Sequence, residues 1–260
     1  MEQTEFESLI VSAPGPVGRL TLNRPGKLNA LSPTMLWELL HAARWFDSRP
    51  EVRVVIVAGA GRAFCAGFDL NFFGGADSRA LEREDADLGR LMTEQIANMR
   101  ALTIAAIQGR CVGGGLVIAA ACDLRVVADD AIFSIPEIDM GIPLAWGGIP
   151  RLVREIGPAM TRELVLDCRE FSASEARTLG FVNRCVPPEK LADEAGNWAA
   201  KLAGKAGHLL EVTKRQVNAA TELLLSPAGA LGDADELLAA LVDPACREMS
   251  RNYLAGRLKR

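Results

Sequence analysis

Two glycine-bearing segments, 64–70 and 109–116, constrain the fold of this chain more than any other feature. They follow short apolar runs at 52–58 and 103–107, and each precedes a segment with a helical pattern. A glycine turn after a buried strand lets the backbone approach a ligand closely, with N–H groups pointing outward. Two such turns can direct two peptide N–H groups at one oxygen, which is the construction of an oxyanion hole. The pattern therefore indicates carbonyl chemistry.

Apolar, β-branched runs alternate with helical patterns over the first 187 residues. The runs predict strands at 6–11, 17–22, 52–58, 103–107, 124–128 and 181–186. The patterns between them predict helices at 33–46, 88–101, 114–121, 147–156, 158–167 and 173–179, the first with Ser32 as its N-cap. This alternation predicts an α/β core over residues 1–187. After Pro187 the patterns predict only helices, so residues 188–260 are expected to form a helical C-terminal region.

Composition and charge exclude several classes of function. The chain has 260 residues and a net charge of -4, which gives no support for a nucleic-acid-binding surface. No apolar stretch reaches membrane-spanning length, and the first five residues are acidic rather than basic. We therefore expect a cytoplasmic protein that binds neither membranes nor nucleic acids. The six cysteines include no CxxC pair, so we expect buried thiols and no metal site.

Histidine usage argues against a hydrolase. The chain has two histidines, His41 and His208, and neither adjoins a plausible nucleophile. A Ser-His-Asp or Cys-His mechanism needs a histidine base. Glu137 is a better candidate for acid–base work, because it follows a proline at the end of the apolar run 132–136. A carboxylate there is costly unless it is exposed, paired or functional, and partial burial would raise its pKa.

Five ordered motifs carry a resemblance to a known family. They are N-R-P-G-K-L-N-A-L at 23–31, F-C-A-G-F-D-L at 64–70, the glycine triplet at 113–115, C-D-L-R at 122–125 and I-P-E-I-D-M-G-I at 135–142. Together they resemble the enoyl-CoA hydratase/isomerase (crotonase) superfamily, from about residue 5 to about residue 255. The resemblance implies a spiral of ββα turns, an acyl-CoA thioester substrate and a homotrimer or homohexamer assembled through the C-terminal helices. It implies no cofactor, since coenzyme A is part of the substrate.

The resemblance also implies roles for individual residues. The N–H groups of Phe68 and Gly114 would hold the thioester oxygen, with the dipole of a helix that begins at Gly114 adding to the stabilisation. Glu137 would be the catalytic acid/base. Asp69, next to the first turn, is also interpreted as a helix N-cap. The residues expected to contact the acyl-CoA, besides Phe68 and Gly114, are Lys27, Leu28, Ala30, Ala66, Asp69, Leu70, Gly113 and Trp146.

The sequence departs from the hydratase pattern at its second carboxylate. Two-glutamate hydratases of the family carry a glutamate two residues after the glycine triplet, where this chain has Val117. Eight residues beyond Glu137, where the dehalogenase branch has an aspartate, it has Ala145. One carboxylate with an oxyanion hole favours a Δ3 to Δ2 enoyl-CoA isomerase. Asp139, two residues beyond Glu137, remains a possible helper.

Two alternatives to the isomerase stay open at this point. One is an enoyl-CoA hydratase of fatty-acid β-oxidation, and the other is a non-catalytic acyl-CoA-binding protein. The glycine-rich and charged segment 74–87 could form a mobile loop beside the site or a solvated helix end. The residues expected to line an acyl pocket are Phe72, Phe73, Leu88, Met92, Leu144 and Trp146.

Overall fold

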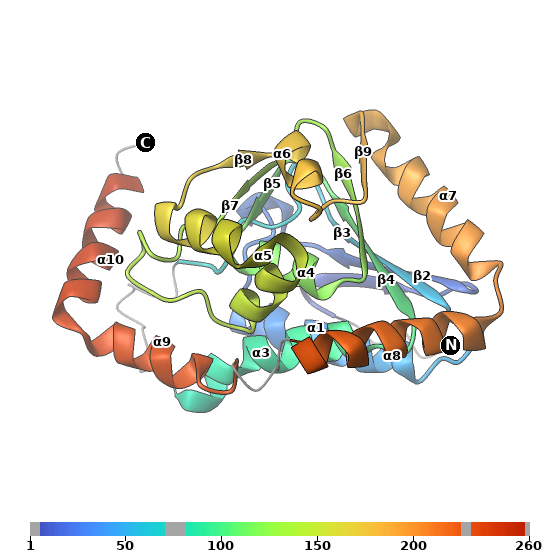
Figure 1. The fold of residues 1–260 in the computed structure, drawn as a ribbon, viewed down its shortest axis with the longest axis horizontal. Helices are drawn as coiled ribbons and strands as arrows, with labels where there is room; N and C mark the ends of the chain where they lie inside the picture. Colours follow the sequence, from blue (N-terminus) through green and yellow to red (C-terminus); the bar gives the residue numbers. More distant parts are fainter. Residues whose placement is uncertain (1–5, 71–81, 225–229, 258–260) are drawn as a thin grey trace.

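The computed structural model describes residues 6–70, 82–224 and 230–257, which form two β-sheets surrounded by helices (Figure 1). The larger sheet has the order β1-β2-β3-β4-β6-β9, and only its β1–β2 pair is antiparallel. The smaller sheet has the order β5-β7-β8. The strands are β1 (Leu9–Ser12), β2 (Val17–Leu22), β3 (Val54–Gly59), β4 (Leu102–Ile107), β5 (Arg110–Val112), β6 (Leu124–Ala128), β7 (Ile132–Ser134), β8 (Phe171–Ser172) and β9 (Arg184–Val186).

Successive turns of the chain repeat one ββα unit. In one turn the chain passes through β4, β5 and α4 (Gly114–Ala121), and in the next through β6, β7 and α5 (Gly148–Asp167). The first strand of each unit joins the larger sheet and the second joins the smaller one, with β4 parallel to β6 and β5 parallel to β7. Parallel neighbours need crossover connections, which the helices provide. The predicted α/β fold with a spiral of ββα turns is confirmed.

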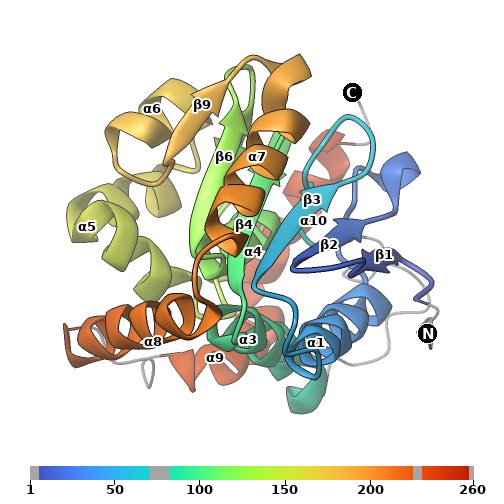
Figure 2. The same cartoon turned by 90° about the vertical axis from the view of Figure 1, so that its right-hand side faces the viewer.

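The larger sheet is covered on both faces. Val54, Ile56 and Ile104 pack with α7 (Leu191–Ala203) on one face. Val55 belongs to the main core on the opposite face, as the alternation of side chains along a strand requires. Figure 2 shows α7 lying across β3, β4 and β6. Helix α7 comes after Pro187 in the sequence but packs on the sheet formed by the residues before it. The division of the chain into an α/β core and a C-terminal region at 187/188 stays a prediction.

Four of the remaining helices pack one on the next. Helix α1 (Pro33–Asp47) begins as predicted, with Ser32 Oγ accepting a hydrogen bond from Met35 N at 3.2 Å. Helix α3 (Arg83–Asn98) packs on α1, and α9 (Asp233–Val242) packs on α3 and on α10 (Pro244–Arg257). Two further helices are α6 (Ala173–Thr178) and α8 (Gly207–Leu224). None of the helices in the described ranges has the length and hydropathy needed to span a bilayer.

Two segments test predicted helix boundaries. Residues 74–81 of the segment 74–87 fall outside the described ranges, and α3 begins at Arg83 with exposed residues in its first turn. Of the two alternatives for this segment, the solvated helix end is therefore confirmed for residues 83–87, and the mobile loop is wrong for them. Acidic residues in the first turn favour a helix N-terminus, and Arg90 adds ion pairs to Asp87 at 2.5 Å and Glu94 at 2.7 Å. The helices predicted at 147–156 and 158–167 meet at Gly157, the one non-helical residue inside α5.

Candidate active site

The two glycine turns lie side by side, joined by a parallel bridge between Cys65 and Cys111. Val112 N donates a hydrogen bond to Cys65 O at 2.9 Å, and Cys65 N donates to Arg110 O at 3.1 Å. A Cβ on Gly67 would lie 3.1 Å from Val112 O and 3.9 Å from Gly114 N. Gly67 has a φ of +90°, which favours glycine on conformational grounds as well. The first turn therefore needs glycine both for its shape and for its contact with the second.

The two predicted oxyanion donors face one cavity. Gly114 begins α4, so its N–H belongs to the first turn of that helix, where N–H groups lack an intrahelical acceptor and the helix dipole is positive. Phe68 lines the same cavity and forms a parallel bridge with Leu31. Gly115 lets α4 approach closely, since a Cβ there would lie 2.6 Å from Cys65 Cβ. The structure thus brings Phe68 and Gly114 together, and their role as donors stays a prediction.

Glu137 stands in the same cavity at the start of the turn that follows β7. Its exposed fraction is 8%, and among the described residues its Oε2 has no hydrogen-bond partner. Burial removes water from the carboxyl and raises its pKa from 4.5 to about 7. The carboxyl packs against Gly113, whose φ is +49° and whose added Cβ would overlap Oε1. Gly113 therefore makes room for the Glu137 carboxyl.

A third segment, residues 28–31, is hydrogen-bonded to the first glycine turn. Ala66 N donates to Leu28 O at 3.0 Å, and Leu31 N donates to Gly67 O at 2.8 Å. Asn29 is fully buried with a φ of +56°, and its Nδ2 donates to the carbonyl oxygens of neighbouring residues in the segment 60–64. Sequence reasoning assigned no role to Asn29. Its amide fixes the distance between this segment and the turn.

Asp69 has a structural partner in Arg24, which precedes the segment 28–31. Its Oδ2 pairs with Arg24 Nη2 at 3.0 Å, and Arg24 Nη1 also donates to Ala30 O. The residues directly after Leu70 lie outside the described ranges, so the predicted N-cap role of Asp69 is not tested. The ion pair shows that Asp69 helps to hold the loop containing Ala30 against the first turn.

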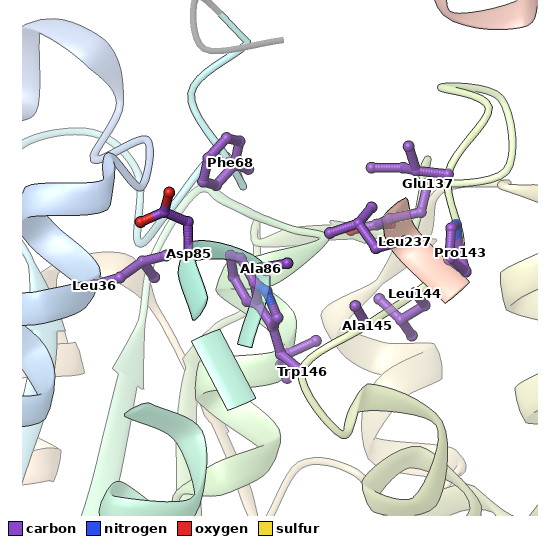
Figure 3. Close-up of a pocket in the computed structure, with 13 residues that line it drawn as sticks. Leu36, Phe68, Asp85, Ala86, Glu137, Pro143, Leu144, Ala145, Trp146 and Leu237 are labelled. Carbon is purple, nitrogen blue, oxygen red and sulfur yellow. The ribbon is translucent and has the colours of Figure 1, made fainter. Parts of the chain in front are cut away.

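The cavity that contains Glu137, Phe68 and Gly114 has a volume of about 50 Å³ and an apolar lining (Figure 3). Val117 and Ala145 both line it, at the two positions where other branches of the family carry carboxylates. The second carboxylate in the wall is Asp85, an exposed residue of α3 that lies across the cavity from Glu137. The other lining residues are Leu36, Ala86, Ile142, Pro143, Leu144, Trp146 and Leu237.

Of the residues predicted to line an acyl pocket, Leu144 and Trp146 line this cavity, and Leu88 and Met92 do not. Met92 is fully buried in the main core, and Leu88 packs against that core rather than lining the cavity. Phe72 and Phe73 lie outside the described residues. Sequence reasoning missed Asp85 on α3 and Leu237 on α9, because no local pattern indicates which helix packs on which.

A second cavity, of about 640 Å³, lies on the other side of the same turns. Leu28 and Ala66, two of the predicted acyl-CoA contacts, line it together with Tyr253 of α10. Asp139 lines this cavity and not the one that contains the Glu137 carboxyl. Lys27 is exposed and is not part of the lining.

Leu70 packs toward the C-terminal helix rather than into either of these cavities. It lines a small cavity with Met140, Ser250 and Tyr253. Ser250 Oγ donates to Met140 O, so α10 holds the turn that carries Glu137. The predicted contact residues therefore do not share one cavity. The cavity of Glu137 is lined by Phe68, Gly114 and Trp146, the second by Leu28 and Ala66, and the third by Leu70.

Comparison with known proteins identifies the family. Residues 13–252 match the model of the enoyl-CoA hydratase/isomerase family. The chain belongs to the enoyl-CoA hydratase/isomerase family. It is 36% identical to a probable enoyl-CoA hydratase of Rhizobium meliloti (strain 1021) over 223 residues, covering 85% of each chain. It is 39% identical over 180 residues to a peroxisomal Delta(3,5)-Delta(2,4)-dienoyl-CoA isomerase of Arabidopsis thaliana, covering 65% of this chain and 64% of that one.

A solved structure shows that this member of the enoyl-CoA hydratase/isomerase family also has the fold of its relatives. An enoyl-CoA hydratase from Mycobacterium avium subsp. paratuberculosis K-10 superposes with a TM-score of 0.87 at 25% identity. The match covers 96% of this chain and 100% of the other. Relatives named as hydratases and relatives named as isomerases both match. The names of the relatives therefore do not determine which reaction this chain catalyses.

Proposed function

We propose that this protein is an acyl-CoA enzyme that moves a double bond from the Δ3 to the Δ2 position of an enoyl-CoA thioester, with Glu137 as its single acid/base. The observation that carries the proposal is the buried Glu137 carboxyl next to Gly114, in a cavity whose lining is apolar apart from Glu137 and the exposed Asp85. Its pKa of about 7 keeps both protonation states accessible near neutral pH. A group that first removes a proton and then returns it needs both states.

The reaction begins with the substrate carbonyl oxygen between the peptide N–H groups of Phe68 and Gly114. The Glu137 carboxylate removes a proton from C2 of the 3-enoyl-CoA, and the electron pair moves into a dienolate whose negative charge rests on the thioester oxygen. The two N–H groups and the α4 dipole stabilise that charge. Glu137 then delivers its proton to C4, which leaves the double bond between C2 and C3.

The two cavities divide the substrate between them in this proposal. The apolar cavity takes the acyl group, and the larger one, lined by Leu28 and Ala66, takes the pantetheine arm of coenzyme A. Lys27 lies at the surface beside that cavity as a point charge for a phosphate of coenzyme A. The proposed reaction needs no separate cofactor.

Val117 distinguishes the isomerase from the second candidate, an enoyl-CoA hydratase. Hydration requires a water molecule held at C3, and Val117 is a fully apolar wall where a second carboxylate would bind that water. The names of relatives such as the Rhizobium meliloti protein favour the hydratase. In the hydratase reading, Glu137 alone would activate the water.

The test is an assay of wild type, Glu137→Gln and Asp85→Asn on 3-hexenoyl-CoA and crotonyl-CoA. Absorbance of the conjugated thioester rises with isomerisation of the first substrate and falls with hydration of the second. We expect isomerisation in wild type, a loss of about a hundredfold or more in Glu137→Gln, and little loss in Asp85→Asn, which removes the other carboxylate of the same cavity.

Three other results would contradict the proposal. Rapid, Glu137-dependent loss of crotonyl-CoA without isomerisation of 3-hexenoyl-CoA would establish the hydratase. No turnover of either substrate, with acyl-CoA binding that Glu137→Gln leaves unchanged, would establish a non-catalytic acyl-CoA-binding protein. Equal losses in Asp85→Asn and Glu137→Gln would show that Glu137 does not act alone.

A further inference from the structure

The Trp146 side chain packs against glycines of two helices. A Cβ on Gly114 of α4 would lie 2.5 Å from Cζ3 of the indole, and a Cβ on Gly89 of α3 would overlap the ring. The ring also meets Phe68 edge-on, with the ring centroids 6.0 Å apart. Both helices therefore lack a side chain where the indole lies. The ring is therefore held beside Phe68 and Gly114, the two predicted oxyanion donors.

The backbone of Trp146 is fixed in a conformation that bulky residues rarely adopt. Its φ is +61°, in the left-handed region. Thr93 Oγ1 donates to its carbonyl oxygen at 2.9 Å, and Arg151 Nη1 donates to the same oxygen at 3.2 Å. Asp233 Oδ2, from α9, accepts a hydrogen bond from Gly147 N at 2.7 Å. A strained residue persists only where its surroundings determine it, and here three separate helices do so.

The space left beside the indole is small. The acyl cavity has about 50 Å³, and its other walls include Val117, Leu144 and Leu237. Val117 is 1% exposed and Leu144 5%, so both walls are backed by packed core. Interiors of that density yield little to a larger ligand. The indole is the bulkiest group in the wall and lies nearest to Gly114.

We infer that Trp146 sets the size limit of the acyl group and restricts the enzyme to short, apolar acyl thioesters. This inference rests on the proposed acyl-CoA chemistry and extends it by naming the class of substrate and the residue that selects it. Removing the indole opens the space between α3 and α4 directly beside the thioester, and a longer hydrocarbon chain enters there.

The test compares 3-hexenoyl-CoA with 3-dodecenoyl-CoA in wild type, Trp146→Ala, Trp146→Phe and the control Trp37→Ala. Trp37 is 52% exposed on α1 and does not line the cavity. We expect wild type to prefer the short substrate and Trp146→Ala to shift the ratio of kcat/KM values toward the long one by at least about tenfold. Trp146→Phe should give a smaller shift, and Trp37→Ala none. If Trp146→Ala does not fold, the smaller shift in Trp146→Phe decides.

An unchanged ratio in the folded Trp146 variants, or wild-type turnover of both chain lengths at similar kcat/KM, would overturn the size limit. Equal loss on both substrates would also overturn it, since a merely structural role affects all substrates alike. If wild type converts neither substrate, the proposed reaction fails but the size limit does not. Titration with butyryl-CoA and dodecanoyl-CoA then decides: a shifted binding ratio in the Trp146 variants supports the limit, and an unchanged ratio overturns it.

Discussion

Replacing Glu137 by glutamine isolates the free energy that burial of this carboxyl costs the folded protein. The pKa of Glu137 is raised from 4.5 to about 7 because water is excluded from a carboxyl that is 8% exposed. The difference of roughly 2.5 pH units, at about 1.4 kcal/mol each, corresponds to ~3 kcal/mol. Glutamine has nearly the same shape and no charge at any pH, so the variant lacks this contribution.

The sign follows from which state of the chain loses the proton first. Below pH 4.5 the carboxyl is protonated in both the folded and unfolded protein, and the cost of burial is absent. Between pH 4.5 and about 7 the unfolded chain ionises while folded Glu137 keeps its proton. Over that window the Glu137 contribution to the free energy of unfolding falls by about 1.4 kcal/mol per pH unit, and above pH 7 it is constant.

Urea denaturation at pH 4, 5, 6, 7 and 8 measures the effect. We expect the stability of Glu137→Gln relative to wild type to rise by ~3 kcal/mol across the window and then to level off. The control is Glu189→Gln, at an exposed glutamate near the start of α7, which should follow wild type at every pH. A difference between Glu137→Gln and wild type that does not vary with pH would refute the reasoning.

Three further substitutions test other parts of the structure. Gly113→Ala places a Cβ against the Glu137 carboxyl at a φ of +49°, so we expect kcat/KM for isomerisation to fall by about a hundredfold or more. Lys214→Met leaves Asp123 without its 2.8 Å ion-pair partner and should lower the free energy of unfolding in urea by roughly 3 kcal/mol. Val217→Arg charges the exposed face of α8, and we expect light scattering to show a trimer or hexamer in wild type and a smaller species in the variant.

Matched controls make each of these outcomes specific. Gly26→Ala meets nothing within 4 Å and should keep wild-type activity, whereas wild-type activity in Gly113→Ala would contradict the packing argument. Lys201→Met removes an exposed lysine of α7 and is the control for Lys214→Met. If both substitutions change the free energy of unfolding equally, the ion pair of Lys214 with Asp123 contributes nothing. A monomeric wild type, or an unchanged mass in Val217→Arg, would exclude α8 as an assembly surface.

The strands that the sequence predicts well are those with many β-branched residues. The run at 52–58 predicts β3 to within two residues, because its Val and Ile side chains are buried on both faces of the sheet. The missed strands β5, β7 and β8 have three residues or fewer. They owe their conformation to hydrogen bonds with segments far away in the chain. Local sequence patterns do not contain that information.

The residues of the candidate site also fall into those that a local sequence pattern indicates and those that it does not. Gly113, Gly114 and Glu137 stand out in the sequence because glycine after a strand and a carboxylate in an apolar run are both locally unusual. Asp85 and Leu237 resemble any other helical residues, and they reach the cavity only because α3 and α9 pack beside it. The position of the Trp146 ring depends on the missing side chain of Gly89, and no local pattern indicates this role.

The order in which the walls of the acyl cavity are synthesised has a consequence for biogenesis. Asp233 and Leu237 of α9, and Ser250 of α10, all contact the segment 137–147 or line the cavity beside it. Asp233 and Ser250 are synthesised 86 and 110 residues after the residues to which they hydrogen-bond. Until α9 has been synthesised, the side of the cavity that Leu237 closes is open, and apolar groups such as Leu144 offer chaperones a binding site. Truncation before α9 would leave the same surface open permanently and expose the shortened chain to degradation.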